Sequence, residues 1–254
     1  MLSDTERVAE YRQRLSDISW FMRLLCQPIA RRANEESNVT GRFFAHRFKC
    51  QRLVDEGALL ACSMYVDLNL VRAGVADTPE QSEFSSAFDR IRGHWQRRRR
   101  EMGQPVEAVS PDHDQDAWLA PLFLDERAAA YSGTPGGSAN PASATCPGPG
   151  APLPFPSPRA SDKGFLPVTH DEYQSLLDWT GRVVRSDKPG AIPSHLAPIL
   201  ERLHVSPAHW VVTVRDFGRL FRTAAGGMAA MRTQAARMGR SWLQGMPYCA
   251  AAFP

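Results

Sequence analysis

Residues 55–74 read DEGALLACSMYVDLNLVRAG, and this stretch predicts a helix with one apolar face. Asp55 is a typical N-cap residue, because its carboxylate can accept hydrogen bonds from the first free backbone N–H groups. The apolar positions that recur at helical spacing are Ala58, Leu59, Cys62 and Val66. Gly74 suits a stop shortly after the end of the helix.

Tyr65 and Asn69 are four residues apart and share one face of this predicted helix. A tyrosine can act as a covalent nucleophile, and a neighbouring amide oxygen can help to hold a hard cation such as Mg²⁺. The same spacing also arises by chance on many helices. A tyrosine at a packing interface and an asparagine at a helix end would then need no catalytic role.

The segment before this helix alternates between two kinds of residue. Residues 42–55 read RFFAHRFKCQRLVD, and the period of two predicts a strand with one apolar and one basic face. The apolar positions are Phe44, His46, Phe48 and Cys50, and the others are Ala45, Arg47, Lys49 and Gln51. His46 would lie on the apolar side, where a partly buried histidine is more common than a metal ligand.

The runs YVDLNLVRAG and GRFFAHRFKCQRLVDEGALLAC resemble two consecutive signatures of the REP-associated tyrosine transposases, which belong to the single-tyrosine HUH superfamily. The similar region covers about residues 20–90. The resemblance implies that Tyr65 is the nucleophile that forms a 5′-phosphotyrosine with DNA, and that Asn69 assists a Mg²⁺ or Mn²⁺ ion. It also implies a single-stranded or hairpin DNA substrate and a protein that acts as a monomer or a homodimer. The DNA-binding residues that we expect are Arg42, Arg47, Lys49, Arg72, Arg90, Arg92, Arg97, Arg98, Arg99 and Arg100.

Two positions depart from the family pattern. Leu70 replaces a proline of the signature, and this change should alter the helix end only modestly. The family also has a histidine–hydrophobic–histidine strand upstream of the tyrosine, but no two histidines of this sequence are two residues apart. We therefore expect a transposase-like chain without its first strands, and little or no DNA cleavage by this chain alone.

Residues 90–100 read RIRGHWQRRRR and contain six arginines. Such a cluster can neutralise several DNA phosphates. A solvated basic tail at the end of a domain explains the same run equally well. His94 lies among these arginines, where contact with solvent or phosphate is more plausible than metal binding.

The rest of the chain divides into helical and irregular segments. Residues 5–32 predict one amphipathic helix that Pro28 ends or kinks, residues 101–131 an irregular arm, and residues 132–164 a disordered or polyproline-like linker. Three helices are expected further on: after a Thr169–Glu172 capping box, from Ser206–Pro207, and over 228–243. We expect a transposase-like domain over 1–104, an arm and linker over 105–165, and a helical region over 166–254.

The composition narrows the class of protein. No apolar run approaches the roughly 20 residues of a membrane helix, and the charged N-terminus does not resemble a secretory signal, so we expect a cytoplasmic protein. The five cysteines form no CxxC pair, which argues against a zinc site or a disulfide framework. The overall expectation is an α+β, mainly helical chain with a remnant of an antiparallel HUH-type sheet. Three functions stay open: a transposase or its remnant, a non-catalytic DNA-binding module, and an interaction protein.

Overall fold

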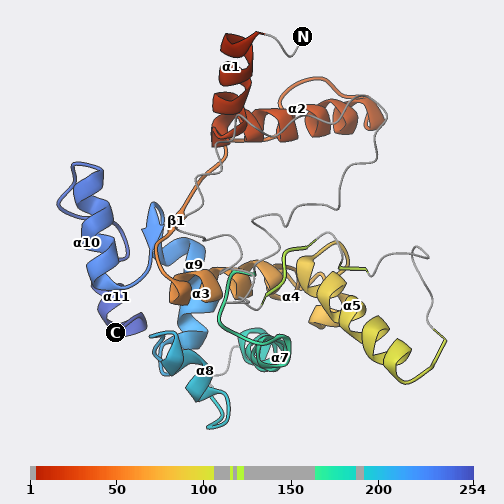
Figure 1. The fold of residues 1–254 in the computed structure, drawn as a ribbon, viewed down its shortest axis with the longest axis vertical. Helices are drawn as coiled ribbons and strands as arrows, with labels where there is room; N and C mark the ends of the chain where they lie inside the picture. The colour runs from red at the N-terminus through yellow and green to blue at the C-terminus, as the bar shows by residue number, and fades with distance from the viewer. Residues whose placement is uncertain (1–3, 106–114, 117–118, 123–163, 187–191) are drawn as a thin grey trace. The chain divides into compact units, whose positions relative to one another are not determined.

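The computed structural model describes residues 4–105, 115–116, 119–122, 164–186 and 192–254, and it divides into two compact units (Figure 1). Unit 1 comprises residues 1–50 and unit 2 residues 51–254. Each unit is described by itself. Among the described residues, every helix is too short or too polar to cross a lipid bilayer.

Unit 1 contains two helices in place of the single helix expected over residues 5–32. Helix α1 spans Thr5–Leu15 and helix α2 spans Ile18–Glu36. The break has a local cause: the Asp17 carboxylate accepts hydrogen bonds from the backbone N–H groups of Ser19 and Trp20, and so begins a new helix. Pro28 lies inside α2 and does not end it. No described residue of unit 1 is buried.

The strand predicted for residues 42–55 is wrong for most of its length. Residues 42–51 form no strand, and only Arg52–Leu53 do so, as β1. A strand requires a hydrogen-bonded neighbour, and among the described residues the partner of β1 is Ala224–Ala225 (β2), which lies about 170 residues later. Alternation of side chains alone does not supply that neighbour. Phe44 and His46, which we expected on the apolar side of the strand, are likewise exposed.

Unit 2 consists of short helices and one very small sheet, which confirms the α+β, mainly helical class. The elements after β1 are α3 (Glu56–Asp67), α4 (Asn69–Arg72), the 3₁₀ helix η1 (Pro79–Gln81), α5 (Ser86–Glu101), α7 (His170–Ser186), α8 (Ala197–Arg202), α9 (Trp210–Leu220), β2, α10 (Met228–Arg237) and α11 (Met246–Ala252). The β1–β2 pair is parallel. The antiparallel HUH-type sheet that we expected is therefore not found among the described residues.

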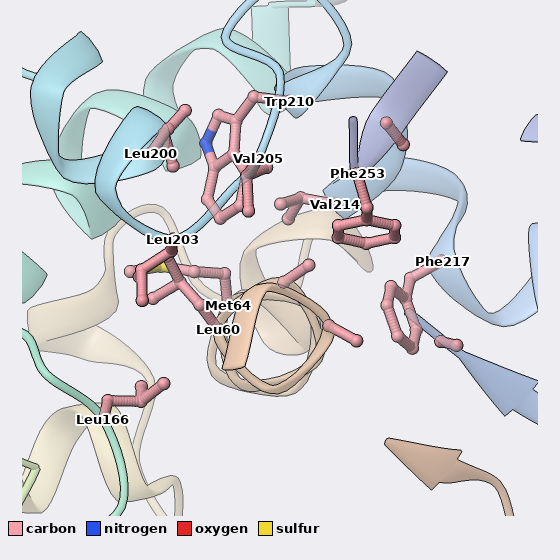
Figure 2. Packing of buried hydrophobic residues seen from close by; sticks show 14 of the residues in the cluster. Leu60, Met64, Leu166, Leu200, Leu203, Val205, Trp210, Val214, Phe217 and Phe253 are labelled. Atoms are coloured by element: carbon pink, nitrogen blue, oxygen red, sulfur yellow. The ribbon is translucent and has the colours of Figure 1, made fainter. Parts of the chain in front are cut away.

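Helix α3 lies at the centre of the core, and Figure 2 shows side chains from the C-terminal part of the chain, such as Trp210 and Phe217, gathered along one side of it. Leu60 and Met64 of α3 are fully buried, as are Trp210 and Val214 of α9. Because one apolar cluster joins α3 to residues 166–253, the expected separation of residues 1–104 from 166–254 is not what these contacts show. The chain divides after Cys50 instead. The predicted linker lies outside the described residues except for its last residue, Gly164, and so does most of the arm.

Local sequence signals placed some C-terminal helices correctly. The Thr169–Glu172 capping box forms, with Glu172 N–H donating to Thr169 Oγ1 at 3.2 Å and Thr169 N–H donating to Glu172 Oε2 at 2.9 Å. The start expected at Ser206–Pro207 is wrong, since α9 begins at Trp210. Ser206 N–H instead donates to the carbonyl of Ala252 at 2.9 Å, which ties this turn to α11.

The helix expected over residues 228–243 is shorter than predicted. It ends at Arg237, just before Gly239, whose φ of +64° is the left-handed conformation that commonly stops a helix.

The Asp55 carboxylate joins the starts of two helices. It accepts hydrogen bonds from the backbone N–H of Ala58, at 2.8 Å, and from that of Gly227, the N-cap of α10. Both helix N-termini carry partial positive charge, which this carboxylate also offsets. The arrangement confirms Asp55 as the N-cap of α3 and adds a contact to a residue far along the chain.

Replacing Asp55 should destabilise unit 2 more than loss of an ordinary cap. Asp55→Ala is expected to lower the free energy of unfolding by about 2–3 kcal/mol, because it removes a cap and leaves the Gly227 N–H without its partner. The control is Ser85→Ala, which removes the cap of α5 at Phe88 N–H and should cost about 1 kcal/mol. Urea denaturation of both variants provides the comparison. Equal losses would contradict the joint role of Asp55.

Candidate nucleic-acid interface

Tyr65 is half-buried on α3 and packs against α9. Its ring centroid lies 5.9 Å from that of Phe217. Its hydroxyl oxygen approaches Gly218 so closely that a Cβ atom there would lie 2.9 Å away. The absence of a side chain at residue 218 therefore makes room for the phenol. The ring belongs partly to the core, as the non-catalytic interpretation of Tyr65 anticipated.

Arg72 covers the outer face of Tyr65. The guanidinium carbon lies 4.2 Å from the ring centroid, a cation–π contact, and Nη1 donates to the Tyr65 carbonyl at 3.5 Å. These two predicted site residues are thus in direct contact. The structure places a cation beside the phenol, which is the charge that a phosphodiester would need there.

The predicted metal ligand is not part of a metal-binding set. Asn69 is exposed at the start of α4 and contributes one amide. Both carboxylate oxygens of the nearby Asp67 accept hydrogen bonds, from Ser86 Oγ and from Tyr173 Oη. The described residues contain no group of three or more His, Cys, Asp or Glu side chains that could together hold a metal ion. These donors do not fit Mg²⁺, which demands near-octahedral coordination by oxygen.

Helix α5 separates the predicted arginines into different environments. Arg92, Arg98, Arg99 and Arg100 are exposed, whereas Arg97 is paired with Asp116, whose two carboxylate oxygens lie 2.7 and 3.0 Å from its guanidinium nitrogens. Arg90 is only 9% exposed. We expected Arg90 to contact DNA, but a side chain this buried is not available to an extended DNA backbone.

One face of α5 combines arginines with aromatic rings. Phe88, Arg92, Trp95 and Arg99 follow helical spacing, the Arg92 guanidinium lies 4.7 Å from the Phe88 ring centroid, and Trp95 is 61% exposed. An exposed tryptophan between two arginines can stack on an unpaired base while the cations contact phosphates. We call these four residues the α5 face.

A second cationic surface lies within unit 1. A groove of about 580 Å³ runs between α2 and the segment that follows Gly41. Its charged and aromatic lining residues are Arg23, Arg42, Arg47, His46, Phe43 and Phe44. Phe43 and Phe44 are 50% and 39% exposed and meet edge to face, with ring centroids 4.9 Å apart. We call it the unit 1 groove; the predicted residue Lys49 is exposed but does not line it.

The sequence analysis missed a buried polar cluster on the other side of α3. Tyr173 Oη donates to Asp67 Oδ2 at 2.6 Å, and Ser86 donates to the other oxygen. Burial and the adjacent Asp67 carboxylate raise the pKa of Tyr173 well above its ordinary value. A signal was present, because Asp67 follows Leu60 and Met64 at helical spacing and so falls on the core side.

Two histidines stack where α5 meets α7. The ring centroids of His94 and His170 lie 4.3 Å apart, and the buried Nε2 of His170 has no hydrogen-bond partner. The pKa of His170 is lowered to about 4, mainly by burial and also by the neighbouring His94 and Arg97. His94 lies 3.8 Å from Asp171 Oδ1. The two histidines therefore contribute to the packing of α5 against α7.

Neither a protein-family profile, nor a curated protein, nor a solved structure matches this chain.

Acid should weaken unit 2 through His170. The pKa of this histidine is about 4 in the folded chain and about 6.5 when unfolded, so protonation favours the unfolded state. The loss begins as the pH falls through about 6.5 and is complete near about 4. The melting temperature of His170→Gln should therefore fall less than that of the parent between about pH 7 and pH 5.

The control for this measurement is His195→Gln, because His195 is exposed. This variant should follow the parent at every pH. A parallel fall in melting temperature for His170→Gln and the parent would show that other groups cause the acid sensitivity.

Proposed function

We propose that this protein binds single-stranded or hairpin DNA in the manner of the REP-associated tyrosine transposases that its sequence resembles, without cleaving it unaided. The observation that carries the proposal is the unit 1 groove, where Arg23, Arg42 and Arg47 surround the exposed pair Phe43 and Phe44. Cationic grooves with aromatic platforms bind unpaired strands, because arginines contact the phosphates and bases stack on the rings.

The α5 face supports the same proposal with an independent surface. Arg92 and Arg99 flank the exposed ring of Trp95. The neighbouring Arg98 and Arg100 add cations near the C-terminal end of the helix, where the helix dipole also stabilises them. The net charge of the whole chain is only +3, so these local concentrations of arginine, rather than overall charge, favour nucleic acid.

Substitutions in the unit 1 groove test this proposal. Arg42→Ala/Arg47→Ala should weaken binding to a labelled single-stranded hairpin, measured by fluorescence anisotropy. It should also reduce the slope of log K against log salt by about 1.4, because two phosphate contacts are lost. The matched control is Arg7→Ala/Arg12→Ala, which removes two exposed arginines of α1 in the same unit and should retain the parent's slope.

The aromatic pair gives a second readout. Phe43→Ala/Phe44→Ala should weaken binding without changing the salt slope, since stacking on a ring involves no counterion release. If the parent's affinity stays flat as salt rises, or if both arginine variants behave alike, the groove is not the DNA site.

DNA cleavage through Tyr65 is a second candidate function, and the contact between Arg72 and the phenol favours it. In that reaction the phenol oxygen attacks a DNA phosphorus and forms a 5′-phosphotyrosine. The bond from phosphorus to the 3′ oxygen breaks, and the 3′-hydroxyl leaves with the proton that the phenol loses. Arg72 would stabilise the negative charge on the phosphate.

We expect binding without covalent capture, because the donor atoms around Tyr65 do not fit a metal ion. A labelled hairpin incubated with the parent and either Mg²⁺ or Mn²⁺ should yield no protein-linked DNA on a denaturing gel. Tyr65→Phe should bind the hairpin as tightly as the parent. An adduct that the parent forms and Tyr65→Phe does not would instead establish Tyr65 as a nucleophile.

A further inference from the structure

Arg90, the buried arginine of α5, lines a small cavity in unit 2. The cavity has a volume of about 190 Å³ and lies between α3, α5 and α7. Its lining residues are Cys62, Ser63, Val66, Asp67, Ser86, Arg90, Leu122, Phe165 and Tyr173. Neither the unit 1 groove nor the α5 face contributes to it, so the cavity is independent of the DNA-binding proposal.

Arg90 has no hydrogen-bond partner among the residues that the structure describes, although it is only 9% exposed. The Asp67 carboxylate also lines the cavity, and both of its oxygens already accept hydrogen bonds, from Ser86 and Tyr173. A guanidinium carries five N–H donors, which an acceptor that enters the cavity can use. Burial accordingly lowers the pKa of Arg90. The side chain is thus poised to bind an acceptor that enters the cavity.

The walls define what kind of molecule could carry that acceptor. Val66, Leu122 and Phe165 present apolar surface, and the Phe165 ring centroid lies 5.8 Å from the Arg90 guanidinium carbon. An apolar protein cavity of about 150 Å³ can hold a benzene molecule, so about 190 Å³ accommodates one small ring with a polar group attached. The Asp67 carboxylate beside Arg90 would repel a doubly charged anion.

We infer that this cavity is a binding site for a small monocarboxylate with a flat apolar body. The carboxylate receives two parallel N–H donations from Arg90, the geometry in which a guanidinium binds a planar oxyanion best. The apolar body lies against Phe165 and Val66. Asp67, which accepts hydrogen bonds from Ser86 and Tyr173, also lines the cavity and disfavours a second negative charge on the ligand.

The test uses the full chain with benzoate and, separately, inorganic phosphate, titrated by isothermal calorimetry. Benzoate should bind, and phosphate should bind at least about tenfold more weakly, because the cavity lacks donors for a second charge. Arg90→Met should weaken benzoate binding by about tenfold or more. The control is Arg232→Met, which removes an exposed arginine of α10 in the same unit and should bind benzoate as the parent does.

A second variant keeps the inference testable if Arg90→Met does not fold. Val66 is 55% exposed at the rim, so Val66→Phe is expected to fold while its larger side chain narrows the cavity and weakens benzoate binding. The inference is overturned if the parent does not bind benzoate, if phosphate binds as tightly, or if the Arg90→Met and Val66→Phe variants retain the parent's affinity. Because none of these measurements involves DNA, their failure would leave the DNA-binding proposal standing.

Discussion

The burial of one face of α3 is the constraint on which the structure of unit 2 depends. Ala58, Leu60, Ala61, Met64 and Leu68 are all fully buried. Their partners come mainly from residues 166–253, so the helix completes its core only with chain that lies a hundred or more residues later. Burial of this apolar surface is the dominant favourable contribution, and it also fixes the rotation of the helix about its axis. That rotation determines the direction in which every other side chain of α3 points.

The fixed rotation explains why neighbouring residues of α3 have such different environments. Tyr65 points to one side, where Phe217, Gly218 and Arg72 surround its ring. Asp67 points to the other, where it accepts from Ser86 and Tyr173 beneath α7. The same reasoning applies to α5, whose contact with this cluster carries Arg90 inward and leaves Arg92 and Trp95 outside. A run of arginines that looks uniform in the sequence therefore divides into exposed side chains and one buried side chain, and each of our two proposals rests on one of these environments.

How much of this could be predicted from the sequence follows from how local each determinant is. The Asp55 cap and the Thr169–Glu172 capping box were predicted correctly, because each depends on groups only three residues apart. The strand over residues 42–55 was wrong because its pairing partner is remote. The inward position of Arg90 was missed because it depends on which side of α5 meets the rest of the core, and spacing within one helix does not reveal that. The family resemblance likewise pointed to Tyr65 and Arg72, but their direct contact depends on the tertiary structure and could not be predicted from it.

Unit 1 lacks the constraint that organises unit 2, and this difference bears on how its groove would work. None of its described residues is buried, although Leu15, Phe21 and Leu24 are large apolar side chains. Short helices in water gain most of their stability from packing of an apolar face, and in unit 1 that contribution comes only from partly buried side chains. Hydrogen bonds such as the Asp17 cap and the Asn34 side-chain donation to the Gly41 carbonyl, at 3.0 Å, hold the local geometry. A ligand seated among Arg42, Arg47 and the two phenylalanines would add the contacts that unit 1 does not make for itself. A ligand that binds in the groove should then also order it. Part of the interaction free energy is used for that ordering, which lowers the net affinity.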